Sequence, residues 1–170
     1  MTKKSTPEIL NGLHNAGSLI RFIPPLDRDQ SEMRELYMLP SLHSWLYQRD
    51  RSKSQDYKPH IRAHLGRYVK GREIDNCEYM KHLCDEVWEF RVQFSSRRRE
   101  NTRVFGSFVH PDKFIATHWR LRGSLGDKAD PRWRETIDLS IRHIRDLSPS
   151  LQRVSAVPFS NCVTFAAIEC

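Results

Sequence analysis

The fold is decided by a stretch in the middle of the chain that reads VWEFRVQF, residues 87–94. From Trp88 onward, apolar residues alternate with polar ones, and a period of two is typical of a β-strand with one buried face. This is the clearest strand signal in the sequence. It is therefore the fixed point from which the other elements are placed.

Two β-prone segments follow this strand, at residues 102–109 and 114–122. A charged loop at 97–101 separates the first strand from the second, and the turn sequence HPDK at 110–113 separates the second from the third. Because both connections are short, the three strands are expected to form an antiparallel meander.

A helix is expected after the meander. A loop at 123–128 leads to Asp130-Pro131, which is typical of a helix start, and Pro149 marks the end. Apolar residues recur on one face of this helix. They are Trp133, Ile137, Ile141, Ile144 and Leu147.

Three elements are expected before the meander. A short apolar run at 19–23, followed by two prolines, predicts a first strand. A helix is expected to begin at Glu32 and to be broken or kinked at Pro40. A second helix is expected at residues 59–70, with Gly71 as its C-terminal cap.

Together these elements predict an α+β fold. A small twisted antiparallel sheet, made of the three-stranded meander and the N-terminal strand, packs against two N-terminal helices and one C-terminal helix. Residues 19–147 are expected to form the domain, and residues 1–18 a flexible, frayed extension. Residues 148–170 form a C-terminal extension that is either an added strand or a partner-binding tail.

The chain carries a surplus of positive charge. Its 170 residues include 28 Lys and Arg against 21 Asp and Glu, a formal net charge of +7. The surplus is concentrated at residues 49–72, where eight basic residues stand against two acids. Fixed positive charge attracts polyanions such as nucleic acid or an acidic protein.

Several classes of protein do not fit the sequence. The apolar run at 163–168 is far shorter than the roughly 20 residues that span a bilayer, and no signal-peptide core is present, so a cytoplasmic location is expected. The four cysteines show no C-x-x-C pairing, which indicates reduced thiols. P-loop, dinucleotide-binding and nucleophile-elbow motifs are missing, and His60 and His64 have no evident third metal ligand, so neither cofactor nor metal is expected.

Residues 80–92, which read MKHLCDEVWEFRV, resemble the "k-x-L-x-d-x-v-w-E-l-R-v" signature of the RelE/HigB superfamily of toxins. The resemblance continues downstream. Arg103-Val104-Phe105 stands where the family has its "R-v" strand, and residues 118–122 stand where phage-derived HigB-like members have "h-G-F-x-K-K". The resemblance spans about residues 19–147, and it implies a RelE-like fold.

The resemblance also implies the toxin component of a type II toxin–antitoxin system. Most members of the superfamily cut mRNA on the ribosome, and each is neutralised by a cognate antitoxin, here expected to be acidic or to contain a helix-turn-helix. Such an endoribonuclease needs no metal ion. A ribose 2′-hydroxyl attacks the adjacent phosphate while basic side chains move the proton and stabilise the negative charge.

The third meander strand carries the expected catalytic residues. Strand alternation places His118, Arg120 and Arg122 on one face of this strand, opposite Ile115. His118 is expected to exchange a proton near neutral pH, and Arg120 or Arg122 to hold a phosphate through paired hydrogen bonds.

Other basic residues are expected to extend this site along the RNA. They are Arg91, Arg97, Arg98, Arg103 and Lys128. A structural role fits the same residues, because solvated sheet faces often carry Arg and His, and Glu89 can pair with an arginine across the strands.

Departures from the family pattern leave other functions open. Arg120 and Arg122 are separated by Leu121 where the family has adjacent lysines, and a loop ending at Lys128 replaces the family's "T-x-K-T-P". One alternative is a non-cleaving RelE/ParE-like or phage-derived module that binds and inhibits a host protein such as gyrase. Another is a sequence-tolerant nucleic-acid binder that uses the helix expected at residues 59–70.

Overall fold

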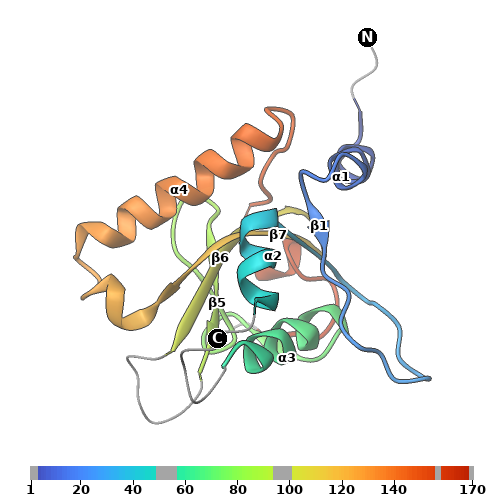
Figure 1. The fold of residues 1–170 in the computed structure, drawn as a ribbon, viewed down its shortest axis with the longest axis horizontal. Helices are drawn as coiled ribbons and strands as arrows, with labels where there is room; N and C mark the ends of the chain where they lie inside the picture. The colour runs from blue at the N-terminus through green and yellow to red at the C-terminus, as the bar shows by residue number, and fades with distance from the viewer. Residues whose placement is uncertain (1–3, 49–56, 94–100, 156–157, 169–170) are drawn as a thin grey trace.

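The computed structural model describes residues 4–48, 57–93, 101–155 and 158–168 (Figure 1). Its fold is α+β, with helices on a mostly antiparallel sheet. The α-helices are α1 (Thr6–Asn15), α2 (Pro40–Tyr47), α3 (Lys58–Val69) and α4 (Pro131–Leu147). The strands are β1 (Ile20–Arg21), β2 (Glu35–Met38), β3 (Ile74–Asp75), β4 (Met80–His82), β5 (Trp88–Val92), β6 (Thr102–His110), β7 (Lys113–Leu121) and β8 (Ala167–Ile168). The short 3₁₀ helices are η2 (Arg122–Leu125) and η3 (Phe159–Asn161).

The predicted meander is confirmed. Strands β5, β6 and β7 pair antiparallel in chain order, and the turn between β6 and β7 places Asp112 in the left-handed region at φ 60°. Trp88, Phe90 and Val92 all lie in the main hydrophobic core. The alternation in this stretch therefore predicted both the strand and its buried face.

The sheet is larger than predicted, and β2 is one reason. A helix was expected from Glu32, but residues 35–38 form a strand that pairs parallel with β7 and antiparallel with β1. With β4 at the far edge, the main sheet has six strands in the order β1-β2-β7-β6-β5-β4. Leu36, Tyr37 and Met38 are at most 2% exposed because β2 lies inside the sheet. A strand buried on both faces shows no alternation of apolar and polar residues, so its apolar run cannot be distinguished from one face of a helix by spacing.

The two helices that follow β2 begin at prolines or next to them. Helix α2 begins at Pro40, the residue expected to break a helix, because the first turn needs no intrahelical N–H donor. Helix α3 confirms the helix expected at residues 59–70, and Gly71 follows it with φ 69° as the expected cap.

The N-terminal segment differs from the expected frayed extension, because residues 6–15 form helix α1. The Glu8 carboxylate accepts a hydrogen bond from the Ser5 N–H at 2.7 Å, which satisfies a free donor at the helix start. Leu10 is fully buried in a small second cluster with Leu19 and Ile144. These apolar contacts thus pack the otherwise polar N-terminal segment against the rest of the fold.

Helices cover the two faces of the sheet (Figure 1). Helices α2 and α3 pack on the face that holds Phe114 and Ala116 of β7, whereas α4 packs against the opposite face through Ile144, which meets Ile115. Helix α4 begins as predicted, and its N-cap Asp130 accepts a hydrogen bond from the next-but-one backbone N–H at 3.0 Å. Within the described ranges, none of the helices has the length and apolar character needed to cross a bilayer.

The C-terminal segment belongs to the folded structure. Strand β8 pairs parallel with β3, so part of this segment forms an added strand. Phe159, Cys162 and Val163 lie in the main core. Cys77, Cys84 and Cys162 are free thiols.

Candidate nucleic-acid interface

The sheet face that α4 crosses carries a row of charged side chains. Arg91 of β5 is opposite Arg103 of β6, and Arg103 is opposite Arg120 of β7. Cross-strand partners project from the same face, so these three arginines lie side by side. Glu89 is two residues before Arg91 and is opposite Lys81 of β4, which places both on this face.

Arg122 joins the row from η2. Its guanidinium lies 5.4 Å from the centre of the Trp133 ring on α4, and its charge acts on both Glu89 and Arg103. We refer to the set as the sheet-face cluster. It consists of Lys81, Glu89, Arg91, Arg103, Arg120 and Arg122.

Glu89 is the single carboxylate of the sheet-face cluster and is only 3% exposed. Its Oε1 lies 3.5 Å from Nε of Arg91, and its Oε2 lies 3.5 Å from Nε of Arg103. Burial raises the pKa of Glu89, against the opposing effect of the Arg103 and Arg91 charges. One carboxylate cannot neutralise five cations, so the cluster has a positive potential that attracts anions.

The arginines of the cluster differ in how firmly they are held. Arg103 is 4% exposed and donates to the carbonyl of its neighbour Thr102 at 3.2 Å, while Arg91 donates to the Cys77 carbonyl. Arg122 is half-buried and donates to the Gly126 carbonyl at 2.6 Å. Arg120 is exposed, and its guanidinium donates to the carbonyl of the adjacent Trp119 at 2.9 Å. Arg120 is therefore the member best placed to meet a ligand.

His118 lies next to the cluster but is covered. It is 8% exposed, and its ring stacks on Phe105 with centroids 5.1 Å apart and 12° between planes. The Thr117 hydroxyl lies 2.9 Å from Nδ1, and His143 of α4 meets the ring edge-on at 6.0 Å. Burial lowers the pKa of His118 to about 3, with Arg120 and His143 adding to the effect. The expectation that His118 exchanges a proton near neutral pH is therefore wrong.

A β-bulge in β7 explains why the alternation pattern assigned Ile115 and His118 to opposite faces of the strand. The pairing of β6 with β7 shifts after Phe105, which is opposite His118, so that Gly106 is opposite Ala116 and Thr117 is the extra residue. As a result Ile115 and His118 face α4 together, although they were expected on opposite faces. The shift depends on Gly106, because a Cβ there would collide with the Ile115 backbone.

The structure brings together some of the expected RNA-binding residues and not others. Arg91 and Arg103 join the cluster with Arg120 and Arg122, whereas Lys128 is exposed in the loop between η2 and α4. Arg97 and Arg98 lie outside the described residues.

Glu89 and Lys81 are the cluster members that the sequence argument did not include as site residues. The sequence did contain a signal for Glu89. It stands two residues before Arg91 in an alternating strand, so its carboxyl group lies on the same face as Arg91. Lys81 gave no signal of its own, because a strand of three residues is too short to show a period.

The chemistry available at the cluster is anion binding. Guanidinium groups donate paired hydrogen bonds to phosphate oxygens, and such contacts position a protein on a nucleic-acid backbone. Within the described part of the chain, no three His, Cys, Asp or Glu residues are grouped as metal ligands. His64, considered above as a ligand, instead stacks on Tyr79, and burial lowers the pKa of His64 to about 4.

Comparison of the chain with protein-family models, with curated proteins and with solved structures finds no match.

Proposed function

We propose that this chain is a RelE/HigB-like toxin of a type II toxin–antitoxin system that cuts mRNA on the ribosome without a metal ion. The observation that carries the proposal is the sheet-face cluster, in which five cations and one buried carboxylate share one face of the meander strands and their neighbours. Two of the three expected catalytic residues, Arg120 and Arg122, belong to it.

In the proposed reaction a ribose 2′-oxygen attacks the adjacent phosphorus. The O2′–P bond forms and the P–O5′ bond breaks, which leaves a 2′,3′-cyclic phosphate and a 5′-hydroxyl. The attacking hydroxyl loses a proton, the leaving oxygen gains one, and the phosphorane between them carries additional negative charge.

The cluster supplies groups for two of these needs, and water supplies the proton for the leaving oxygen. Arg120 and Arg122 hold the phosphate and stabilise the phosphorane. Glu89 accepts the 2′-hydroxyl proton once its ion pairs with Arg91 and Arg103 are exchanged for contacts to phosphate, because a carboxylate with a raised pKa is a stronger base than a solvated one. The leaving oxygen takes a proton from water, and Glu89 returns its proton to water. His118 has no part in this scheme because it is buried and neutral.

The proposed partner is a cognate antitoxin, either acidic or containing a helix-turn-helix. The net charge of +7 supports an acidic partner by complementarity. A neighbouring reading frame that encodes such a protein, and whose product suppresses the growth arrest caused by this chain, is the expected finding.

The proposal is tested by translation-coupled mRNA cleavage, mapped by primer extension in a translation extract. The wild-type chain is expected to cut the transcript, and the Arg120→Ala/Arg122→Ala variant to lose at least about a hundredfold in rate, since each removes charge stabilisation of the transition state. The matched control is Arg142→Ala/Arg145→Ala, which removes two exposed arginines from α4. Equal cutting by the wild type and the Arg120→Ala/Arg122→Ala variant contradicts the assigned site.

Burial of the two side chains considered for proton transfer, Glu89 and His118, favours a second candidate function. Glu89 is 3% exposed and His118 is 8% exposed, so neither meets solvent freely. A non-cleaving module of the ParE-like or phage-derived kind would use the same cations to bind a host protein such as gyrase. Intact mRNA together with a stable complex with a host factor, lost in the Arg120→Ala/Arg122→Ala variant, supports this candidate over the first.

A further inference from the structure

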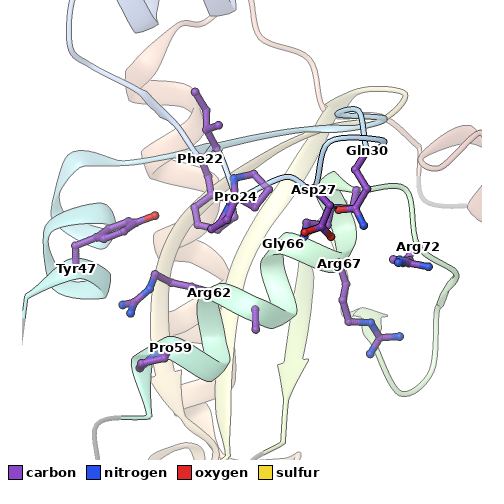
Figure 2. Close-up of a pocket in the computed structure, with 14 residues that line it drawn as sticks. Phe22, Pro24, Asp27, Gln30, Tyr47, Pro59, Arg62, Gly66, Arg67 and Arg72 are labelled. Atoms are coloured by element: carbon purple, nitrogen blue, oxygen red, sulfur yellow. Dashed lines mark hydrogen bonds between the residues drawn. The ribbon is translucent and has the colours of Figure 1, made fainter.

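A groove on the other side of the molecule lies between the segment 22–30 and helix α3 (Figure 2). Its volume is about 840 Å³. Pro24 rests on α3 at Gly66, where a Cβ would lie 3.3 Å from the Pro24 Cβ. In Figure 2, Tyr47 and Arg62 lie at one end of the groove, and Asp27 and Arg72 lie toward the other.

The wall of the groove is apolar and partly open to solvent. Ile23 is 63% exposed and Tyr47 is 48% exposed, although both are large hydrophobic residues. Pro24, Pro25 and Pro59 add further apolar surface. Grouped exposed apolar residues mark surfaces that bind a partner.

The rim of the groove is cationic. Arg62, Arg67, Lys70 and Arg72 line it, against the single carboxylate of Asp27. Within the described residues, none of these four cations forms an ion pair with a carboxylate. Their charge is therefore available to an anionic ligand.

Two features favour a peptide over a nucleic acid. Single-stranded nucleic acid binds through free aromatic faces on which bases stack. Tyr47, the exposed ring of this groove, already contacts the Arg62 guanidinium at 5.2 Å and the His43 ring at 4.5 Å. The rest of the apolar wall is proline and aliphatic, which suits an apolar side chain instead. Pro24 and Pro25 have no N–H, so the ligand is held by its side chains and not as an added strand.

We propose that this groove, the α3 groove, binds an acidic peptide segment of a partner protein, with an apolar side chain inserted between Ile23 and Pro59 and carboxylates paired to the cationic rim. No member of the sheet-face cluster is among the described residues that line the α3 groove, although Arg67 of its rim also lines a smaller pocket with Arg91 of the cluster. The proposal therefore stands whether or not the chain cuts RNA.

The test is fluorescence anisotropy with the full chain and a labelled dodecapeptide in which Leu-Trp-Leu is flanked by Asp and Glu. Three comparison probes are used: the same peptide with Asn and Gln for the acids, the same peptide with Ser for Leu-Trp-Leu, and an oligouridylate of equal charge. The acidic apolar peptide is expected to bind, and each comparison probe to bind at least about tenfold more weakly, because charge and apolar contact contribute separately.

Variants then locate the binding. Lys70→Glu/Arg72→Glu and Ile23→Asp are each expected to weaken the peptide about tenfold or more, and neither alters a buried side chain. The control Arg142→Glu/Arg145→Glu reverses the same charge on exposed positions of α4 and is expected to change nothing. Circular dichroism verifies that each variant is folded.

Three outcomes overturn the proposal. The first is absence of peptide binding, or binding that is insensitive to Ile23→Asp. The second is tighter binding of the oligouridylate with the same variant pattern, which assigns the α3 groove to nucleic acid. The third is self-association that Ile23→Asp abolishes in sedimentation, which assigns it to a second copy of this chain.

Discussion

The face of the sheet that α2 and α3 cover is lined by aromatic rings, whereas the face that α4 crosses carries the sheet-face cluster and pairs of small polar groups. On the first face, Phe90 and Phe108 each lie 5.0 Å from Phe114, and all three are fully buried. On the second, the Thr117 hydroxyl contacts the Ser140 hydroxyl at 3.0 Å. One face of the sheet is therefore mostly apolar, whereas the other combines the charged cluster with the smaller apolar cluster around Ile115 and Ile144.

The difference indicates that one face mainly stabilises the fold and the other mainly binds a ligand. Burial of apolar area is the main source of folding free energy, and the first face provides most of it. Buried charges add little or nothing to stability, because their removal from water offsets their attraction. Charge kept on the second face at that cost is better explained by ligand binding than by stability.

The largest expected effect is on the apolar face. Phe90→Ala removes a ring that contacts Phe114 at 5.0 Å and Tyr68 at 5.4 Å, and it should lower the free energy of unfolding by about 3–5 kcal/mol. Urea denaturation measures the loss. Ile23→Ala, at an exposed position, is the control and should change stability by no more than about 0.5 kcal/mol. A loss below about 1 kcal/mol for Phe90→Ala would remove the contrast between the faces.

The next effect tests whether the ion pair between Glu89 and Arg103 contributes to the free energy of unfolding. Glu89→Met leaves Arg103 buried without its carboxylate, and it should cost about 3 kcal/mol. The double variant Glu89→Met/Arg103→Met should recover to within about 1 kcal/mol of the wild type, because the deeply buried cation is then removed too and Arg91, the other partner of Glu89, is partly exposed to solvent. The same denaturation experiments supply both values. A double variant as unstable as the single one would show that the ion pair stabilises the fold.

The pH dependence of stability sharpens the comparison further. His118 has a folded pKa of about 3, below its ordinary value of 6.5. The stability that the fold gains from keeping His118 neutral is therefore full above pH 6.5 and is lost as the pH falls toward 3. Between pH 6.5 and 4.5 this single group should remove about 2 kcal/mol of stability. His118→Phe keeps the stack on Phe105 and should abolish that part of the pH dependence.

His64 provides an independent measure of the same effect. Burial lowers its pKa to about 4, so it too destabilises the fold as pH falls below 6.5. His64→Phe and His118→Phe should reduce the pH dependence additively, since the rings lie on different sides of the sheet. An unchanged stability profile in His118→Phe would mean that α4 does not cover this histidine in solution.

The smallest effect concerns the small cluster on the α4 side, to which α1 belongs. Gly12 is exposed within α1 with nothing within 4 Å of an added Cβ, so Gly12→Ala should stabilise the chain by about 0.5–1 kcal/mol. Gly17 follows the helix with φ 73°, so Gly17→Ala should destabilise it by about 1 kcal/mol. If α1 were frayed, both substitutions would leave the thermal midpoint unchanged.

Helices and strands whose apolar residues recur with a clear helical or strand period were predictable from the sequence. The alternation in 88–92 and the proline and Asp130 at the start of α4 predicted their elements because local preference and tertiary burial agree there. β2 was not predictable, because burial on both faces removed the alternation that distinguishes a strand from a helix.

The candidate site was predictable only in part. Arg91, Arg103 and Arg120 were correctly placed on one face, because regular antiparallel pairing relates them. The burial of His118 was not predictable, because it depends on a bulge and on how closely α4 approaches. The α3 groove was likewise beyond prediction, because it is formed by two segments that carry no shared sequence pattern.

The salt dependence of RNA affinity tests the central claim most directly. Dissociation constants for a single-stranded RNA are measured over a salt series for the wild type, for Arg120→Gln/Arg122→Gln in the sheet-face cluster, and for Lys70→Gln/Arg72→Gln in the α3 groove. The sheet-face variant should weaken binding and reduce the slope of log affinity against log salt by about 1.4, the value for two lost phosphate contacts, while the α3-groove variant matches the wild type. The reverse pattern, with the slope reduced only by the α3-groove variant, would contradict the account.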